Sequence, residues 1–134
     1  MSHQDEEIVR DVLSLWERGI VGVTEAYNRL HHEDIHWWNS ARGSVIGRRA
    51  CIEGCEYMFE LLGVASVRVP VRRLVSNHGV VFVERSDDLY RRDGSLIAAV
   101  PVTGVIEIDN GKIREWRDYC VDWLAAFLPK SANS

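Results

Sequence analysis

The sequence changes character near Val64, and this change constrains the fold more than any other feature. Before this point apolar residues recur at helical spacing, whereas after it β-branched residues dominate and short turn sequences interrupt them. Turns are expected at residues 77–79, 92–95 and 109–111, and Asp109-Asn110-Gly111 is a strong hairpin signal. Helices followed by a strand meander predict an α+β protein, with the helices packed on one face of a curved, mostly antiparallel β-sheet.

The expected elements follow from the same pattern. Helical periodicity predicts helices at residues 5–18, 24–32 and 48–62, with Gly63 ending the third. Strands are predicted at 35–39, within 42–47, and at 64–76, 80–90, 96–108 and 113–120. Pro101 is expected at a bulge or an edge of the sheet, and residues 122–128 are expected to form a short closing helix.

Length, composition and charge exclude several classes of protein. With 134 residues, 46% of them hydrophobic and 27% charged, the chain is expected to form one domain over residues 1–134. The net charge of −4 and the lack of a basic block argue against nucleic-acid binding. No apolar run approaches the roughly 20 residues that span a bilayer, so no membrane association is expected. The polar, acidic start of the sequence is unlike a secretory signal, and a cytoplasmic location is therefore expected.

The three cysteines are an odd number and include no CxxC pair. Cys51 and Cys55 lie one helical turn apart and are expected to pack as small hydrophobic residues. Neither they nor Cys120 is expected to form a structural disulfide or a zinc site.

The segment His32-Glu33-Asp34-Ile35-His36 matches the HExxH pattern of zinc proteases. A zinc site of this kind needs both histidines on one face of a continuous helix, but the helical spacing ends just before the motif. In a strand the two histidines would lie about 13 Å apart, too far to share one ion, although Glu53 and Glu56 could supply a third ligand. No metal site is expected.

Two segments place a carboxylate inside a sequence that otherwise reads as a strand, namely Glu84-Arg85-Ser86-Asp87 and Trp116-Arg117-Asp118-Tyr119. Alternate residues of a strand share a face, so Arg85 and Asp87 point the same way as nearby apolar residues. A charge on an apolar face must be paired or hydrogen-bonded. If the strand of Asp118 is a neighbour, one arginine holds two carboxylates in a cavity, which suits general acid–base catalysis. The alternatives are a solvent-facing Arg85–Asp87 ion pair, and an Asp118 that bonds a nearby arginine, Arg114 or Arg117.

These motifs and their order resemble the limonene-1,2-epoxide hydrolase family. The resemblance is strongest in Val83-Glu84-Arg85-Ser86-Asp87 and from Gly111-Lys112-Ile113 through Trp116-Arg117-Asp118-Tyr119. In addition, Trp37-Trp38-Asn39 matches an aromatic-x-Asn element on an early strand. The resemblance covers nearly the whole chain, and it implies the cone-shaped α+β fold of nuclear transport factor 2 and a homodimer that pairs through the exposed sheet face.

The resemblance also implies roles for particular residues. Asp87, Arg85 and Asp118 would form an Asp-Arg-Asp triad, and Asn39 would hold the attacking water. The family's water-holding tyrosine falls on Trp37, whose indole N–H can donate a hydrogen bond but cannot accept one. Either the water is held differently here or the reaction is not simple hydrolysis. Without the resemblance, Asn39 reads as a residue that caps a turn.

Several other residues are expected to line a substrate pocket. Trp37 and Trp116 are placed there because Trp116 shares a strand face with Asp118. Further pocket residues are expected from the helix at 48–62 and the strand at 80–90, namely Met58, Phe59, Leu62 and Leu89. For the helical residues, plain core packing is the alternative.

Together these features predict a cofactor-independent enzyme that adds water to a small, largely apolar epoxide and releases a vicinal diol. Asp118, next to Asn39, would deprotonate the water while Asp87 protonates the ring oxygen, although the two roles could be reversed. One alternative is an epoxide-opening cyclase of polyketide or polyether type, which Trp37 mildly favours. Another is a non-catalytic domain that binds a small ligand. An isomerase is less expected, because it needs one base beside an oxyanion hole.

Overall fold

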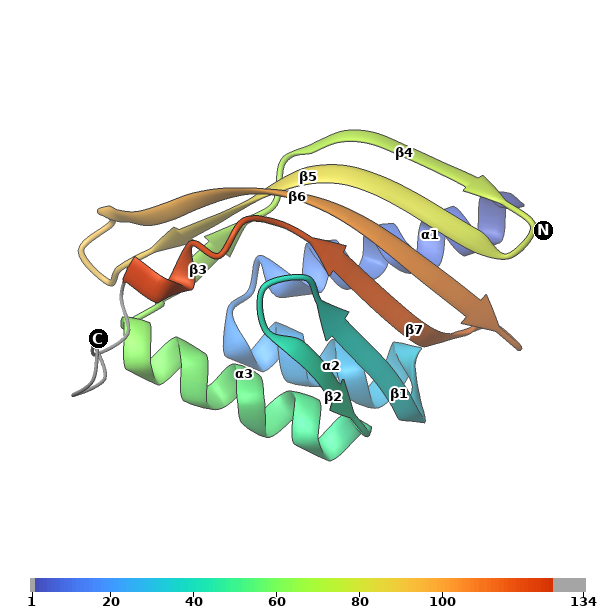
Figure 1. The fold of residues 1–134 in the computed structure, drawn as a ribbon, viewed down its shortest axis with the longest axis horizontal. Coiled ribbons are helices and arrows are strands. Elements are labelled where there is room, and N and C mark those ends of the chain that lie inside the picture. The colour runs from blue at the N-terminus through green and yellow to red at the C-terminus, as the bar shows by residue number, and fades with distance from the viewer. Residues whose placement is uncertain (1, 127–134) are drawn as a thin grey trace.

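Three helices lie against one face of a bent β-sheet in the computed structural model, which describes residues 2–126 (Figure 1). In chain order, the elements are α1 (Ser2–Trp16), α2 (Ile20–Leu30), β1 (His31–Asn39), β2 (Gly43–Ile46), α3 (Arg48–Leu62), β3 (Ser66–Arg68), β4 (Val71–Asn77), β5 (Val80–Tyr90), β6 (Leu96–Asp109), β7 (Lys112–Tyr119) and the 3₁₀ helix η1 (Leu124–Ala126). This architecture confirms the α+β class that the sequence predicts. No helix within this part of the chain is long and apolar enough to cross a membrane.

The sheet has the strand order β2-β1-β7-β6-β5-β3, and β4 pairs with β5 as well. All paired strands are antiparallel except β1 and β7, which run parallel. The parallel pair aligns Trp37 with Trp116 and Asn39 with Asp118. Two motifs that lie far apart in the sequence are therefore side by side in the sheet.

The middle of the chain matches the predicted bounds. Helix α3 spans Arg48–Leu62 and β5 spans Val80–Tyr90, as predicted, and Gly63 ends α3 in the left-handed conformation at φ 70° and ψ 34°. Helix α1 lies somewhat earlier than expected, and α2 begins at Ile20 rather than near residue 24. The early start of α2 follows from Gly19, which has a φ of 77° and whose carbonyl accepts the N–H of Val23.

The single strand predicted over residues 64–76 is wrong, because β3 and β4 are separate strands. Pro70 lies between them and has no N–H to contribute to a ladder. Its carbonyl instead accepts the N–H of Ser86 at 3.0 Å. The pairing register of β4 with β5 also shifts between Val71 and Arg73, as at a β-bulge, so the pairing is irregular just after Pro70.

Pro101 lies where the sequence places it, at an edge. It is opposite Ser86 of β5, whereas β7 pairs with β6 only from Thr103 onward. Within residues 2–126, Pro101 therefore has no strand partner on its β7 side, where a missing N–H breaks no ladder bond. Of the closing helix expected at 122–128, the structure describes the short η1, and residues 127–128 lie outside the described part of the chain.

The core fills the space between the helices and the sheet. Its largest fully buried side chains come from both layers: Trp116, Ile35, Ile106, Ile113, His31, Val9, Val12, Val81 and Val83. His31 is the polar member of this set at 1% exposure. Its Nδ1–H donates to the carbonyl of Ala26 at 2.9 Å, and its ring packs between those of Tyr27 and Trp116. Burial lowers the pKa of His31 to about 4, so the ring is neutral at pH 7.

We expect His31 to destabilise the fold in mild acid. The pKa of His31 in the folded protein, about 4, lies below the ordinary 6.5. The contribution of the neutral ring to the free energy of unfolding is therefore complete above pH 6.5 and is lost as the pH falls toward 4. Between pH 7 and pH 5, the free energy of unfolding should fall by about 2 kcal/mol more in the wild type than in His31→Asn, which keeps a donor for Ala26. Urea unfolding at both pH values measures the difference.

The matched control is His3→Asn, because His3 is exposed on α1. This variant should lose stability in parallel with the wild type. If His31→Asn also does so, the neutral buried ring is not the source of acid sensitivity.

Candidate active site

A cavity of about 360 Å³ lies between the helices and the sheet. Its wall is mostly apolar and is built from all three helices, from the strands β1, β2, β3, β5, β6 and β7, and from the segment after β7. On the sheet side, the polar members of the wall are Asn39, Asp87 and Asp118. These are three of the residues that the sequence singles out.

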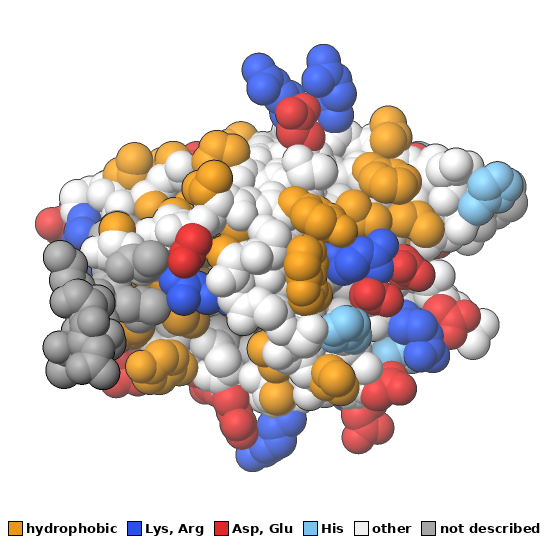
Figure 2. Space-filling view, viewed as in Figure 1, with side chains coloured by type: hydrophobic (Ala, Val, Ile, Leu, Met, Phe, Trp, Pro, Cys, Tyr) orange, Lys and Arg blue, Asp and Glu red, His pale blue; other side chains and the backbone are white. Residues whose placement is uncertain are grey.

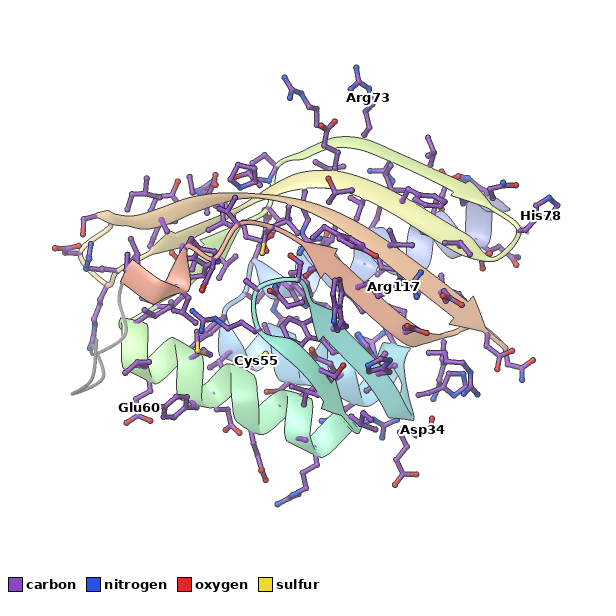
Figure 3. All side chains as sticks on the ribbon, viewed as in Figure 1. Asp34, Cys55, Glu60, Arg73, His78 and Arg117 are labelled. Atoms are coloured by element: carbon purple, nitrogen blue, oxygen red, sulfur yellow. The ribbon has the colours of Figure 1, made fainter. Side chains whose placement is uncertain are left out.

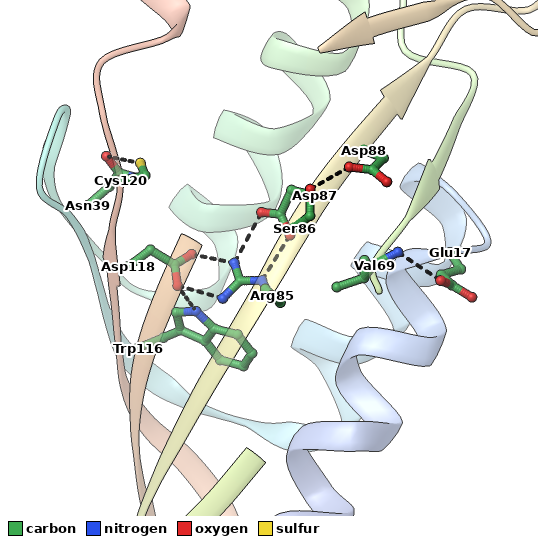
Figure 4. Close-up of polar contacts among 10 residues, drawn as sticks. All are labelled: Glu17, Asn39, Val69, Arg85, Ser86, Asp87, Asp88, Trp116, Asp118 and Cys120. Atoms are coloured by element: carbon green, nitrogen blue, oxygen red, sulfur yellow. Dashed lines mark hydrogen bonds and ion pairs between the residues drawn. The ribbon is translucent and has the colours of Figure 1, made fainter. Parts of the chain in front are cut away.

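Arg85 joins the two carboxylates of this wall (Figure 4). Its Nε and Nη2 donate to Asp87 Oδ1 and Oδ2 at 2.8 and 3.1 Å, and its Nη1 and Nη2 donate to Asp118 Oδ1 and Oδ2 at 3.0 and 2.9 Å. The Arg85 side chain is 0% exposed, against 24% for Asp87 and 7% for Asp118. Both pairs are therefore bidentate and largely shielded from water, unlike a solvent-facing ion pair.

The strands that carry these residues are not neighbours, which corrects one assumption of the sequence analysis. Strand β6 lies between β5 and β7, and the register aligns Val83, Gly104 and Asp118 across the three strands. A Cβ on Gly104 would lie 2.8 Å from Arg85 Nη1 and 3.0 Å from Asp118 Oδ1. The Arg85 side chain therefore crosses β6 at the one position of that strand that lacks a side chain. An isolated glycine inside a strand is a known sign of such a close approach, and it is the signal in the sequence that could have located this one.

Two indole rings enclose the guanidinium. The carbon Cζ of Arg85 lies 5.2 Å from the ring centre of Trp16 and 5.8 Å from that of Trp116, within the range of a cation–π contact. Trp116 Nε1–H also donates to Asp118 Oδ1 at 2.8 Å. Trp116 is 1% exposed and is not part of the cavity wall, so its predicted pocket role is wrong. Trp116 lies behind the Asp118 carboxylate and holds it by this hydrogen bond. Trp16 of α1, which the sequence did not suggest as a pocket residue, forms part of the cavity wall.

The two acids have unlike environments. Asp118 accepts hydrogen bonds from three N–H groups, two of Arg85 and one of Trp116. Among residues 2–126, Asp87 accepts two, both from Arg85, and burial raises its pKa above the ordinary value although the charge of Arg85 opposes this. Burial alone would lower the pKa of Arg85, but Asp118 and Asp87 more than offset this and raise it, so the guanidinium stays charged.

Asn39 fits both interpretations that the sequence offers. Its Oδ1 accepts the N–H of Ala41 at 2.8 Å, as in a turn, and its Nδ2 lies 3.4 Å from Cys120 Sγ. Its side chain also forms part of the cavity wall, in register with Asp118. Trp37 lies in the same wall.

The remaining predicted pocket residues divide into two groups. Leu89, Met58 and Phe59 line the cavity. Leu62, the last residue of α3, does not; it packs against the core below the helix end. Helical spacing gives the inward face of α3 but not the point along it where the cavity stops.

Cys51 lies in the hydrophobic core and Cys55 packs against it, as predicted, and both also line the cavity, as does Cys120. They are free thiols. Cys55 lies on the side of α3 that faces the sheet, whereas Glu60 lies on the opposite side (Figure 3). Burial raises the pKa of Cys51 to about 11 and that of Cys55 to about 12, so both are protonated at neutral pH.

The whole HExxH segment lies in β1, which begins at His31 rather than at the predicted residue 35, because α2 ends at Leu30 rather than at residue 32. His32 Nε2 is 2.8 Å from the carbonyl oxygen of Asp109, and His36 Nε2 is 2.9 Å from Ser44 Oγ. Among residues 2–126, no cluster of three or more His, Cys, Asp or Glu side chains could hold a metal ion.

Gly104→Ala should displace Arg85 or Asp118, because the new methyl group would lie within 3.0 Å of both side chains. We expect the free energy of unfolding to fall by about 1–3 kcal/mol, measured by urea denaturation. The matched control is Gly54→Ala on α3, whose Cβ would meet nothing within 4 Å. It should leave stability unchanged or raise it by about 0.5–1 kcal/mol. Equal effects at the two positions would contradict the close approach at Gly104.

The fold and the site together define a class of protein: a nuclear transport factor 2-like α+β cone with a buried acid–arginine–acid cluster at an apolar cavity. The model of the limonene-1,2-epoxide hydrolase catalytic domain matches residues 19–128, so the chain belongs to that family. A search of curated protein sequences gave no significant match.

Solved structures show the same fold. An LEH-like epoxide hydrolase of M. tuberculosis is 21% identical, with a TM-score of 0.71 over 90% of this chain and 84% of the other. A protein described as a SnoaL-like polyketide cyclase, from Jannaschia sp. CCS1, is 17% identical, with a TM-score of 0.76 over 93% and 90%. An NTF2-like protein of unknown function from Cytophaga hutchinsonii is 18% identical, with a TM-score of 0.63 over 87% and 98%. At these identities the structures establish the fold alone.

Proposed function

We propose that this protein is an epoxide hydrolase that adds water to a small, largely apolar epoxide and releases a vicinal diol, without a cofactor. One observation carries the proposal: a fully buried arginine bridges two carboxyl groups in the wall of an apolar cavity. Opening an epoxide requires one group that gives a proton and another that takes one at the same pH. Two acids in unlike environments on one arginine meet this requirement.

Asp87 is the proton donor in this proposal. One guanidinium balances only one carboxylate, so the cluster is electrically neutral when Asp87 carries a proton. Burial favours the same state, because it raises the pKa of Asp87. The Asp87 proton passes to the ring oxygen as the carbon–oxygen bond breaks.

Asp118 is the base. It is held by three N–H donors and lies in register with Asn39, whose amide nitrogen has donor capacity besides its contact with Cys120. Asp118 takes a proton from the attacking water as the water oxygen bonds to the ring carbon. Proton exchange with solvent then restores both acids.

The cavity supports a small substrate. A volume of about 360 Å³ is near the lower end of the usual range for small-molecule sites, about 300–1,000 Å³. Its apolar wall, with Met58, Phe59 and Leu89, suits a hydrocarbon skeleton around the reacting ring.

Asp87→Asn and Asp118→Asn should each lower kcat/KM for epoxide opening by about 10²–10⁴-fold, because each removes one proton transfer. Asp88→Asn is the matched control: Asp88 is the next residue of β5 and accepts a hydrogen bond from Ser86 Oγ. It should stay within about twofold of the wild type, since its substitution removes no proton transfer. Turnover of cyclohexene oxide, followed by chromatography, measures all three. Full activity in both cluster variants would refute the mechanism.

A second candidate is an epoxide-opening cyclase, in which a hydroxyl of the substrate replaces water. Trp37 favours it, because an indole cannot accept a hydrogen bond from a water molecule. The product distinguishes the two reactions: a diol is heavier than the epoxide by one water, whereas a cyclic ether has the same mass. Tight ligand binding without turnover of any epoxide would instead support a non-catalytic binding domain.

We also propose that the protein forms a homodimer through the outer face of the sheet. The strand registers align Val75, Phe82, Val105, Arg117 and Trp38 in one row across this face. Val75 and Phe82 are 58% and 42% exposed, and Tyr119 beside the row is 46% exposed. Figure 2 shows hydrophobic side chains gathered on this side of the molecule next to charged ones. Such a mixture of apolar and Arg side chains is typical of an interface.

Phe82→Glu should convert a dimer of about twice 15.3 kDa into a monomer, because it puts a charge on the apolar part of the row. Light scattering coupled to size exclusion measures the mass. Val21→Glu is the control, since Val21 is also an exposed apolar residue, at 67%, but lies on α2. Val21→Glu should leave the dimer intact. A monomeric wild type would overturn the dimer proposal and leave the hydrolase proposal untouched.

A further inference from the structure

The helix side of the cavity holds a polar group that the proposed reaction does not use. Tyr27 of α2 is 3% exposed and lies in the cavity wall, together with Cys51 and Cys55 of α3. Its ring packs against His31 at 4.5 Å between ring centres, which fixes the position of the phenol. The polar groups next to the Tyr27 hydroxyl are the thiols of Cys51 and Cys55.

A thiol is a weak partner for this hydroxyl. Sulfur is a poorer donor and acceptor than oxygen, and a buried hydroxyl without a strong partner costs free energy. Phenylalanine at this position would pack equally well in a purely apolar wall. The hydroxyl is therefore explained better by an oxygen atom that enters the cavity than by the side chains around it.

Several other polar groups of the wall have strong partners. Asp87 and Asp118 are bound by Arg85, Asn39 by Ala41, and Arg42 by Asp122 at 2.7 Å. Trp16 Nε1 is also buried in this wall without a hydrogen-bond partner among residues 2–126, so the wall offers an entering oxygen atom two donors, this N–H and the Tyr27 O–H on the α2 side. Burial raises the pKa of Tyr27 well above its ordinary value, so its O–H is a neutral donor throughout the physiological range.

We propose that the Tyr27 hydroxyl binds a second oxygen of the substrate, so that the preferred epoxide carries a hydroxyl or carbonyl group besides the ring. This inference rests on the proposed hydrolase function and deepens it. The substrate would lie with its epoxide at Asp87 and Asp118 and its second oxygen toward α2, with the apolar wall between them. The contact orients the substrate and takes no part in bond breaking.

The test compares two epoxides in two proteins. Cyclohexene oxide and 3,4-epoxycyclohexan-1-ol share a skeleton and differ in one hydroxyl. In the wild type we expect kcat/KM to favour the hydroxylated epoxide by about five- to tenfold, the effect of one hydrogen bond. In Tyr27→Phe this preference should fall to about one, while turnover of cyclohexene oxide changes by less than about twofold.

Tyr57→Phe is the matched control, because Tyr57 of α3 is 64% exposed. It should keep the wild-type preference. A wild type without preference overturns the inference even if Tyr27→Phe does not fold, and so does a Tyr27→Phe enzyme that keeps the preference.

A binding measurement separates this inference from the proposed function. Cyclohexanone and methylenecyclohexane have nearly the same shape, and only the first has an oxygen. If the wild type opens neither epoxide, the hydrolase proposal fails, and tryptophan fluorescence titration with these two compounds still tests Tyr27. Preference for cyclohexanone that Tyr27→Phe abolishes supports the contact, whereas equal affinities of the wild type for both compounds refute it.

Discussion

One buried arginine shared by two carboxyl groups is the interaction on which the rest of the site depends. Arg85 has no exposed side-chain surface and reaches from β5 across β6 to Asp118 on β7. Loss of Arg85 would leave the buried carboxyl groups without a counter-charge, and breaking a buried ion pair in this way commonly costs about 3–5 kcal/mol. Burial raises the pKa of Asp87 against the opposing charge of Arg85. This is the direction that the proposed role of Asp87 as proton donor needs.

Local spacing predicted part of this cluster and could not predict the rest. Strand alternation placed Arg85 and Asp87 on one face, and they do share it. The contact with Asp118 depends on strand order, which is set by pairing between distant segments and is not contained in the spacing of either motif. Gly104 makes the long reach possible, and its only trace in the sequence is a glycine inside a strand.

The same division holds for the surroundings of the cluster. The bounds of α3 and β5 were predictable because Gly63 and the flanking turns mark their ends. Periodicity gave the inward face of each element but not the depth of each side chain, so Leu62 and Trp116 were placed in a pocket that they do not line. Trp16 and Tyr27 have ordinary core spacing on their helices, and only tertiary packing shows that they face the cavity.

The parallel pairing of β1 with β7 has a consequence for how this enzyme family can change. Parallel strands leave the sheet at the same end, so residues 40–42 and 120–123 leave it together, joined by Ser40–Cys120 hydrogen bonds and the Arg42–Asp122 ion pair. Five of these residues belong to the cavity wall: Ala41, Arg42, Cys120, Asp122 and Trp123. Loops of this kind tolerate change better than the strands that carry them. Substitutions in residues 40–42 and 120–123 can therefore change which molecules enter the cavity, while Asp87, Arg85 and Asp118 keep their alignment.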